Sequence, residues 1–521
     1  MVRIRHLKCD ETKPHCLRCL KFGVECDFYL TKARHGGPPF KSNAKPLAPR
    51  PSPSHTTFYL LSQKLFSDEQ EQRYFRFFCD KTSHGLSGYF DSALWSQVVL
   101  QACENDSAIR HAVVAIGALD LTSKRSGSRI QAHQLLNDEA GQDHRFALQQ
   151  YGLAIKRMRE STSEKKVDLR TMLIGCILLT CFETFHGNHQ SAIAQIQSGL
   201  GLLEDWHSQH TPNSDEVLGT SSPSPFVVDD EILQALGRLD LQSMTFLDPR
   251  PKEIHNRMRR YGQASINAMP KTFATLKEAR VYLELVMRRF MHFMISISNV
   301  EGSDGVMKLS DPSPDIPEFI LADQRRHMKE LQRWHSAFTP LLKCARTVEG
   351  KKNFLAATVL ETHYLSSYFG LDAMTLDSRS SASRSTPVFR EIVSLCTDIL
   401  SHPSAIADET KYKFDLQIVA SLYATGLRCR HSGIRRQAAA LLLSSPRREG
   451  VWDAVLAGKI VGWVADIEEE DGLDGEFMKE GKGIIDLKFD FNLQARSVHL
   501  QCLQIRTGSD ILVEREATLT W

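Results

Sequence analysis

The sequence predicts a mainly α-helical protein with a short β segment near its C-terminal end. Apolar residues make up 42% of the 521 residues and charged residues 24%, which is close to the average of soluble globular domains. From about Phe58 onward apolar side chains recur at helical spacing, whereas alternating runs typical of strands are confined to the C-terminal end. The chain can therefore bury a substantial core, and the pattern disfavours an all-β architecture.

Positive charge is concentrated in the first fifty residues. Residues 1–50 carry eleven Lys and Arg against four Asp and Glu, whereas the remaining residues carry 53 basic and 58 acidic groups. A basic N-terminal segment, the head, on a mildly acidic remainder, the body, predicts that the head binds a polyanion. A basic, solvated tail is the alternative that charge alone leaves open.

The sequence predicts neither a membrane protein nor an enzyme. No apolar run reaches the ~18 residues of a membrane-spanning helix, and we expect the longest, Met172 to Phe182, to be a buried core helix. Residues 1–30 lack the apolar core of a secretion signal. The sequence has no phosphate-binding glycine loop, nucleophile elbow or zinc-protease motif. We therefore expect no enzymatic activity and no membrane partner.

Four of the twelve cysteines crowd into eighteen residues. Cys9, Cys16, Cys19 and Cys26 are separated by six, two and six residues. Zinc prefers four thiolate or imidazole ligands in tetrahedral geometry, and a two-residue gap lets Cys16 and Cys19 hold one ion from a single turn. So short a segment cannot bury a core, and metal binding would have to supply its folding energy. We predict a small zinc-dependent module over residues 1–30, with disulfides or unliganded thiols as the alternatives.

The other eight cysteines stand singly or in apolar surroundings. Because a free cysteine behaves as a small hydrophobic residue, we expect these to be core residues in a reducing compartment. They are Cys79, Cys103, Cys176, Cys181, Cys344, Cys396, Cys429 and Cys502.

Basic residues are interleaved with the four clustered cysteines. Some of these cations could merely balance the negative charge of a zinc–thiolate cluster. The surplus is what binding to a phosphate backbone requires. The residues are Arg3, Arg5, Lys8, Lys13, Arg18 and Lys21.

The segment from Arg3 to Cys26 resembles the fungal zinc binuclear cluster, a DNA-binding module in which six cysteines hold two zinc ions. The four clustered cysteines match its third to sixth cysteines, and Pro14 matches the proline of its loop. The resemblance implies zinc as the cofactor and double-stranded DNA as the partner.

The same resemblance implies roles for the basic residues. Arg3 and Arg5 fall on the helix that enters the major groove, and Lys8 holds the place of the lysine that reads a CGG-type triplet. Lysine is a good donor to guanine O6 and N7, so this role makes physical sense. Arg18 and Lys21 are expected to contact the DNA backbone.

The chain departs from the family pattern at its start. Val2 stands where the second cysteine would lie, and the first would lie before Met1. The complete module holds two zinc ions, so we expect one ion or a partial site in the chain as written. We favour a missing first exon as the interpretation; a true loss of DNA binding and a rearranged single-zinc site are the alternatives.

Residues 31–57 are predicted to form a basic linker. Six prolines fall between Pro38 and Pro53, just after Gly36 and Gly37, and such a segment is expected to be an extended tether. Its basic residues could assist DNA-backbone binding or nuclear import, or they could simply be solvated. No apolar heptad pattern follows the cysteines, so a coiled-coil dimer is not supported and dimerisation stays open.

Residues 58–521 are predicted to form a large, helical domain. A first helix is expected to be capped by Asp106 or Ser107 and to bury Ile109, Ile116 and Leu119. Later helices are expected near 168–185, 231–245, 273–298, 318–347, 353–374, 388–401, 413–429, 432–444 and 450–468, with loops at 208–228, 301–317 and 377–387. An antiparallel sheet or hairpin is expected from Ile484 to Phe491, Ser497 to Gln504 and Ile511 to Leu519. His186 and His189, at a predicted turn, and the acidic run 468–471 are interpreted as solvated.

Two segments of this domain resemble the regulatory half of the same fungal family. They are the aromatic run from Tyr74 to Phe78 and the segment from Arg435 to Trp452. The resemblance implies an all-helical regulatory domain and a nuclear, sequence-specific DNA-binding regulator of RNA polymerase II transcription, with transcription co-regulators as protein partners. The alternative is a non-DNA-binding helical regulatory or ligand-sensing protein that keeps a remnant of the zinc cluster.

Overall fold

The computed structural model of the chain divides into two compact units, Met1–Ser62 and Gln63–Trp521. The predicted zinc module, residues 1–30, and the predicted linker, residues 31–57, lie outside the described residues. The structure describes residues 65–521 except for 67, 91, 126–138, 165–166, 211–218, 247, 298–305, 309–315, 376–377, 409, 471, 480–482, 493–494 and 506–511.

The described residues are mainly helical, which confirms the predicted fold class. The α-helices are α5 Glu69–Phe77, α6 Ser83–Ser87, α7 Val99–Asn105, α8 Ser107–Arg125, α9 Glu139–Ser163, α10 Leu169–His186, α11 His189–His210, α12 Asp230–Phe246, α13 Lys252–Met258, α14 Gln263–Asn267, α15 Leu276–Ile297, α16 Glu318–Ala345, α17 Phe354–Asp372, α18 Ser378–Ser401, α19 Pro403–Ile406, α20 Val419–Arg428, α21 Ser432–Ser444 and α22 Ala454–Glu469. Shorter helical turns are η2 Phe78–Thr82, η3 Leu94–Val98, η4 Lys351–Asn353 and η5 Ala373–Thr375.

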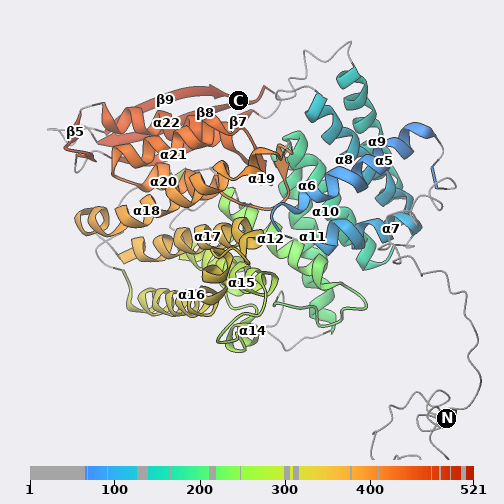
Figure 1. Cartoon of the computed structure of the whole chain (residues 1–521), viewed down its shortest axis with the longest axis horizontal. Coiled ribbons are helices and arrows are strands. Elements are labelled where there is room, and N and C mark those ends of the chain that lie inside the picture. The colour runs from blue at the N-terminus through green and yellow to red at the C-terminus, as the bar shows by residue number, and fades with distance from the viewer. Residues whose placement is uncertain are drawn as a thin grey trace, which may run out of the picture. The chain divides into compact units, whose positions relative to one another are not determined.

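Buried side chains form three hydrophobic cores that follow one another along the chain. The first core is built mainly by α5 to α12, the middle core by α15 to α17, and the last core by α17 to α22 with the C-terminal strands. Figure 1 shows the same succession, from the blue and teal helices through the green and yellow ones to the orange and red helices and strands. The large helical domain therefore has three packing centres.

Helix α10 is the central helix of the first core. It begins after Asp168, whose side chain accepts a hydrogen bond from the N–H of Thr171, and it ends at Gly187, where φ is +98°. A left-handed residue of this kind favours glycine and terminates a helix. Among the helices that the structure describes, α10 is the one with the length and apolarity to cross a membrane, but 67% of that window is buried inside the protein. The predicted core helix is confirmed.

The C-terminal strands form the predicted antiparallel sheet. Strands β7 Ile484–Asn492, β8 Ser497–Ile505 and β9 Leu512–Thr520 pair in sequence order, and the short β1 Val306–Lys308 joins the free side of β7. Leu487 lies opposite Cys502, and both are buried. Alternate positions of β9 are exposed, as expected when one face of a sheet packs on helices. In Figure 1 the sheet lies along α21 and α22.

Two aromatic side chains from late in the chain complete the first core. Tyr412, on strand β2 Tyr412–Lys413, stacks on Phe185 with ring centroids 4.5 Å apart, and its hydroxyl lies 2.5 Å from Thr184 Oγ1. Phe414 meets Trp95 edge to face at 4.9 Å. Strand β2 pairs in parallel with β3 Arg448–Glu449, which pairs with β4 Trp452–Asp453. We call residues 412–417 the strap, because they tie the last part of the chain to the first core.

Two predicted boundaries are wrong. Helix α18 begins at Ser378 and runs through Pro387, so the loop expected at 377–387 is largely helical; a proline there removes one backbone hydrogen bond without ending this helix. The helix expected from 413 begins at Val419, because the apolar residues before it extend as part of the strap.

Candidate functional site

The predicted metal-binding and DNA-contacting side chains all lie outside the residues that the structure describes. Four thiols match the donor preference of zinc and suffice for one tetrahedral ion. The two ions of a six-cysteine module need more thiolate ligands than these four residues supply. The residues concerned are Cys9, Cys16, Cys19 and Cys26 for zinc, and Arg3, Arg5, Lys8, Arg18 and Lys21 for DNA.

The remaining cysteines behave largely as predicted. Five of the eight are buried and two are half-buried, but Cys344 is exposed, so the prediction is wrong for that residue. Burial raises the pKa of the Cys79 thiol to about 12 and the pKa of the Cys176 thiol to about 11. These two thiols stay protonated at neutral pH and are poor metal ligands. Across the described part of the chain, no group of three His, Cys, Asp or Glu side chains is placed to hold a metal ion.

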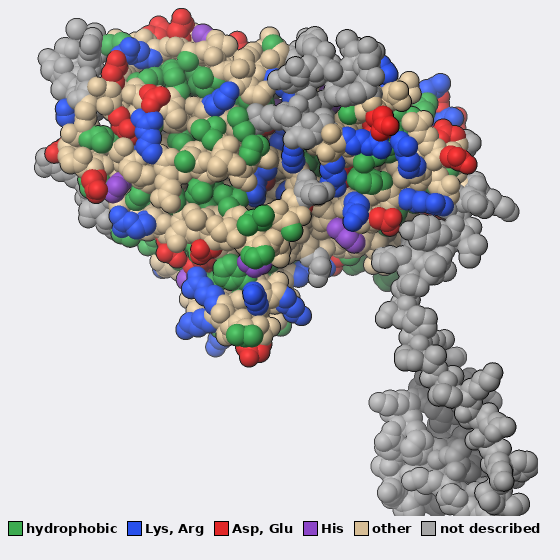
Figure 2. Space-filling model, turned by 45° about the horizontal axis from the view of Figure 1, so that its top comes forward, with side chains coloured by type: hydrophobic (Ala, Val, Ile, Leu, Met, Phe, Trp, Pro, Cys, Tyr) green, Lys and Arg blue, Asp and Glu red, His purple; other side chains and the backbone are tan. Residues whose placement is uncertain are grey.

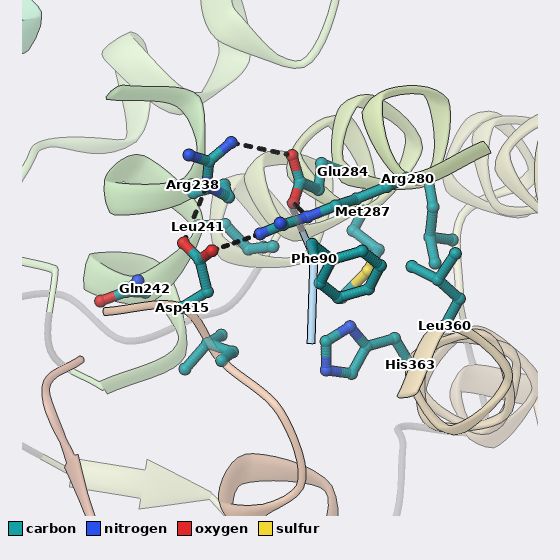
Figure 3. A pocket seen from close by; sticks show the side chains of 12 residues that line it. Phe90, Arg238, Leu241, Gln242, Arg280, Glu284, Met287, Leu360, His363 and Asp415 are labelled. Atoms are coloured by element: carbon teal, nitrogen blue, oxygen red, sulfur yellow. Dashed lines mark hydrogen bonds and ion pairs between the residues drawn. The ribbon is translucent and has the colours of Figure 1, made fainter. Parts of the chain in front are cut away.

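A small cavity lies where α12, α15, α17 and the strap meet (Figure 3). Its volume is about 20 Å³, which is room for about one water molecule. The lining is half apolar and half polar: Phe90, Arg238, Leu241, Gln242, Arg280, Leu283, Glu284, Met287, Leu360, His363, Asp415 and Leu416. The polar side chains come from elements that are distant in the sequence.

Asp415 of the strap is the centre of the ion pairs in this cavity. Arg238 Nε donates to one of its carboxylate oxygens at 2.8 Å, and Arg280 donates to the other at 2.6 Å. Glu284 accepts from Arg280 Nε at 2.6 Å and lies 3.7 Å from Arg238. Burial alone would raise the pKa of Asp415, but the two guanidinium groups outweigh it and hold that pKa below its usual range.

This arrangement acts as a joint between helices. The two positive and two negative side chains neutralise one another, as Figure 3 shows, and they leave no net charge to recruit a ligand. A ligand pocket for a small molecule would need several hundred Å³. Because Asp415 joins α12 to α15, it links the first core to the middle core through the strap.

A second buried carboxylate fixes the end of the strap. Glu449 Oε2 accepts hydrogen bonds from the backbone N–H groups of Gln417, Ile418 and Val419, at 2.8, 2.9 and 2.9 Å. These are donors at the start of α20 that have no partner within that helix. Burial raises the pKa of Glu449. Glu449 therefore holds the strap and the first turn of α20 in one position.

His189 is not solvated, contrary to the prediction. Its side chain is buried, and its ring centroid lies 5.1 Å from that of Phe246. Burial, together with the nearby Arg448, lowers its pKa to about 4. The prediction failed because the turn at Gly187 folds against the last core.

Two residues of the acidic run at the end of α22, Glu468 and Glu469, are not solvated either, whereas Glu470 is exposed. Glu468 is buried, accepts a hydrogen bond from Arg435 at 2.7 Å, and also accepts the N–H of Ile484 at 2.9 Å. Glu469 is paired with Arg436 at 2.8 Å. The run thus connects α21, α22 and the sheet. The sequence did offer a signal for this pairing, because Arg435 and Arg436 lie on the preceding helix, and opposite charges on consecutive helices can pair.

Comparison with known protein families gives two matches in this chain. Residues 3–35 match the fungal Zn(2)-Cys(6) binuclear cluster domain, and residues 73–227 match the fungal specific transcription factor domain. The chain therefore resembles fungal zinc-cluster transcription regulators in both segments. The second match covers most of the helices of the first core, whereas the resemblance noted from Arg435 to Trp452 lies outside it and stays a prediction.

Two curated relatives of this chain are transcription regulators. One is the aspercryptin biosynthesis cluster-specific transcription regulator atnN of Emericella nidulans, 24% identical over 354 residues, which are 65% of this chain and 53% of the relative. Another is the transcription regulator lscL of Purpureocillium lilacinum, 26% identical over 224 residues, which are 40% of this chain and 49% of the relative. The chain thus spans about half the length of these relatives. No solved structure matches it.

Proposed function

We propose that the chain is a zinc-dependent, sequence-specific DNA-binding regulator of RNA polymerase II transcription that acts in the nucleus. The observation that carries this proposal is the match of residues 3–35 to the zinc-cluster domain in the same chain as the transcription factor domain. Cys9, Cys16, Cys19 and Cys26 are the proposed zinc ligands. DNA and transcription co-regulators are the proposed partners.

In this proposal Lys8 reads the base sequence. It stands directly before Cys9, where the resemblance places the lysine that donates to guanine in a CGG-type triplet. Arg3 and Arg5 support the same helix in the major groove. Arg18 and Lys21 contact phosphates and contribute affinity without sequence information.

Two substitutions test these roles. Lys8→Ala should weaken binding to a CGG duplex by about 1–3 kcal/mol and reduce the preference over a scrambled duplex. Arg18→Ala should weaken binding to both duplexes equally and lower the salt dependence by about one unit of slope. Fluorescence anisotropy at several salt concentrations measures both effects. Equal losses on both duplexes for Lys8→Ala would refute the base-reading role.

The rival proposal, ligand sensing by a chain that does not bind DNA, has less support. The cavity at the junction of the helical body has a volume of only about 20 Å³, and its charged side chains are paired with one another. A wild-type chain that binds zinc but shows no preference for CGG over scrambled DNA would favour the rival.

A further inference from the structure

The last turn of α16 and the connection from α16 to α17 carry four cations. Lys343, Arg346, Lys351 and Lys352 are all exposed, and none of them forms an ion pair within the described part of the chain. One exposed carboxylate, Glu349, lies between them, so the segment has a net charge of +3. We call residues 343–352 the cationic turn.

The cationic turn differs from the rest of the surface. On the face shown in Figure 2, Lys and Arg side chains lie beside Asp and Glu over the upper part of the surface, and they also gather on the lobe at its lower edge. Arg436, an exposed arginine, has carboxylate partners at 2.6 and 2.8 Å. Residues 51–521 have more acidic than basic groups, so an isolated group of unpaired cations is not a consequence of composition.

Two of the four cations lie at a favourable helix end and two at an unfavourable one. Lys343 stands in the last turn of α16 and Arg346 caps that helix, where the helix dipole favours positive charge. Lys351 and Lys352 stand immediately before α17, and a helix dipole disfavours positive charge at that end. The four cations also repel one another. The two dipole effects oppose each other and the repulsion remains, so a contribution to stability does not account for the group.

The backbone of the cationic turn is held in one conformation. The N–H of Thr347 donates to Cys344 O at 2.9 Å, and the N–H of Asn353 donates to Gly350 O at 2.8 Å. The N–H of Gly350 donates to Thr347 Oγ1 at 3.2 Å. A Cβ on Gly350 would lie 2.0 Å from Cys344 O, so only glycine fits there. The cations are thus presented from a fixed scaffold, which lowers the ordering cost of binding.

We propose that the cationic turn binds the phosphate backbone of the DNA that the zinc module recognises. The proposal rests on the proposed function. Unpaired Lys and Arg are the groups that neutralise phosphates. An acidic protein is a poorer fit, because the exposed apolar side chains in the turn are the small Cys344 and Val348, and protein interfaces depend on larger buried anchors.

The covalent link between head and body allows this contact. Thirty-eight residues separate Cys26 from Leu65, and an extended chain of that length can span up to about 130 Å. The turn adds affinity without sequence preference, since phosphate contacts carry no base information. It would raise the affinity of the whole protein for any duplex that the zinc module already holds.

The test uses the full chain and two quadruple variants with equal charge loss. The first replaces Lys343, Arg346, Lys351 and Lys352 with Ala. The matched control replaces four exposed cations that are scattered over η2, α9, α18 and β7 and have no ion pair among the described residues. They are Lys81, Arg159, Arg390 and Lys488.

Binding of each protein to a CGG duplex and to a scrambled duplex is measured by anisotropy between 50 and 200 mM salt. The slope of log K against log salt is negative, and each lost phosphate contact reduces its magnitude by about 0.9. The turn variant should therefore reduce the magnitude of the slope by about 2–4 on both duplexes. The control should change it by less than one. The preference for CGG should be unchanged in both variants.

Three outcomes would overturn the proposal. One is an equal fall in slope for the turn variant and the control, which would mean that only net charge matters. Another is wild-type DNA binding by the turn variant together with lost binding of a labelled acidic peptide, which would assign the turn to a protein partner. The third outcome concerns a variant with Lys351→Arg, Lys352→Arg and Arg346→Lys, which keeps every charge. A salt-dependence slope for this variant that differs from the wild-type slope would overturn the proposal.

Failure of the proposed function is distinguishable from failure of this inference. A wild-type chain without preference for CGG would refute the proposed function, while the slopes on the scrambled duplex would still decide the role of the turn. Circular dichroism melts of all variants should coincide with the wild type, because every substituted side chain is exposed.

Discussion

Asp415→Ala should destabilise the helical body more than any single substitution of a surface ion pair. Its carboxylate is 7% exposed and joins two arginines that are themselves about 10% exposed. After the substitution Arg280 keeps Glu284 at 2.6 Å, whereas the remaining contact of Arg238 to Glu284 is 3.7 Å long. Arg238 is then left buried without a close partner, and the removal of one member of a buried pair typically costs about 3–5 kcal/mol.

Urea denaturation followed by circular dichroism measures this loss. With a urea slope of about 3 kcal/mol per M, the midpoint should fall by about 1–1.7 M. The control is Asp466→Ala, because Asp466 is 69% exposed and Arg436 keeps Glu469 after its removal; its cost should be below about 1 kcal/mol. Equal midpoints for the two variants would refute the view that Asp415 joins the cores.

The effect of Asp415 should also depend on pH. The folded-state pKa of Asp415 is lowered, so its contribution is fully present above the unfolded-state pKa of about 3.9 and is lost as the pH falls through the lower folded-state pKa. The difference in stability between wild type and Asp415→Ala should therefore shrink below about pH 4. A difference that grew on acidification would contradict the sign of the shift.

Three further predictions follow from the same structure. Phe414→Ala should cost about 3–5 kcal/mol, because the side chain is 1% exposed and packs on Trp95, whereas Phe226→Ala should be nearly neutral at a fully exposed side chain; equal urea midpoints would contradict the packing argument. Folding lowers the pKa of His189 from about 6.5 in the unfolded chain to about 4, so the wild type loses stability as the pH falls from 6.5 to 4. His189→Phe should make this loss smaller. An unchanged pH profile would show that His189 does not contribute to it. A chain beginning at residue 58 should melt cooperatively and without response to a zinc chelator, and a shift of many degrees in its melting temperature would show that the body itself needs metal.

Local patterns in the sequence were sufficient to predict most of the helices. Helix α8 buries Ile109, Ile116 and Leu119 as expected, and α10 ends at the predicted break. The strands also follow from simple alternation. These features depend on neighbours within a few residues, which is the range that periodicity reports.

Features that depend on distant partners were not predictable. Nothing around Asp415 indicates that it meets Arg238 and Arg280, which are about 177 and 135 residues away. The same holds for Tyr412, whose stacking partner Phe185 stands far earlier in the chain. For the proposed zinc and DNA site the reverse is true, because the spacing of Cys9, Cys16, Cys19 and Cys26 is itself local information.

The strap has a consequence for how this protein is made. The segment matched by the transcription factor domain ends at residue 227, yet its core contains Tyr412 and Phe414. During synthesis at about 5–20 residues per second, these two aromatic rings leave the ribosome roughly 10–40 s after that segment is complete. Until Tyr412 and Phe414 are available, the apolar surfaces of Trp95 and Phe185 that they cover are exposed. The nascent chain should therefore depend on chaperones during that interval, and a messenger that stops before residue 412 should yield a product that is degraded.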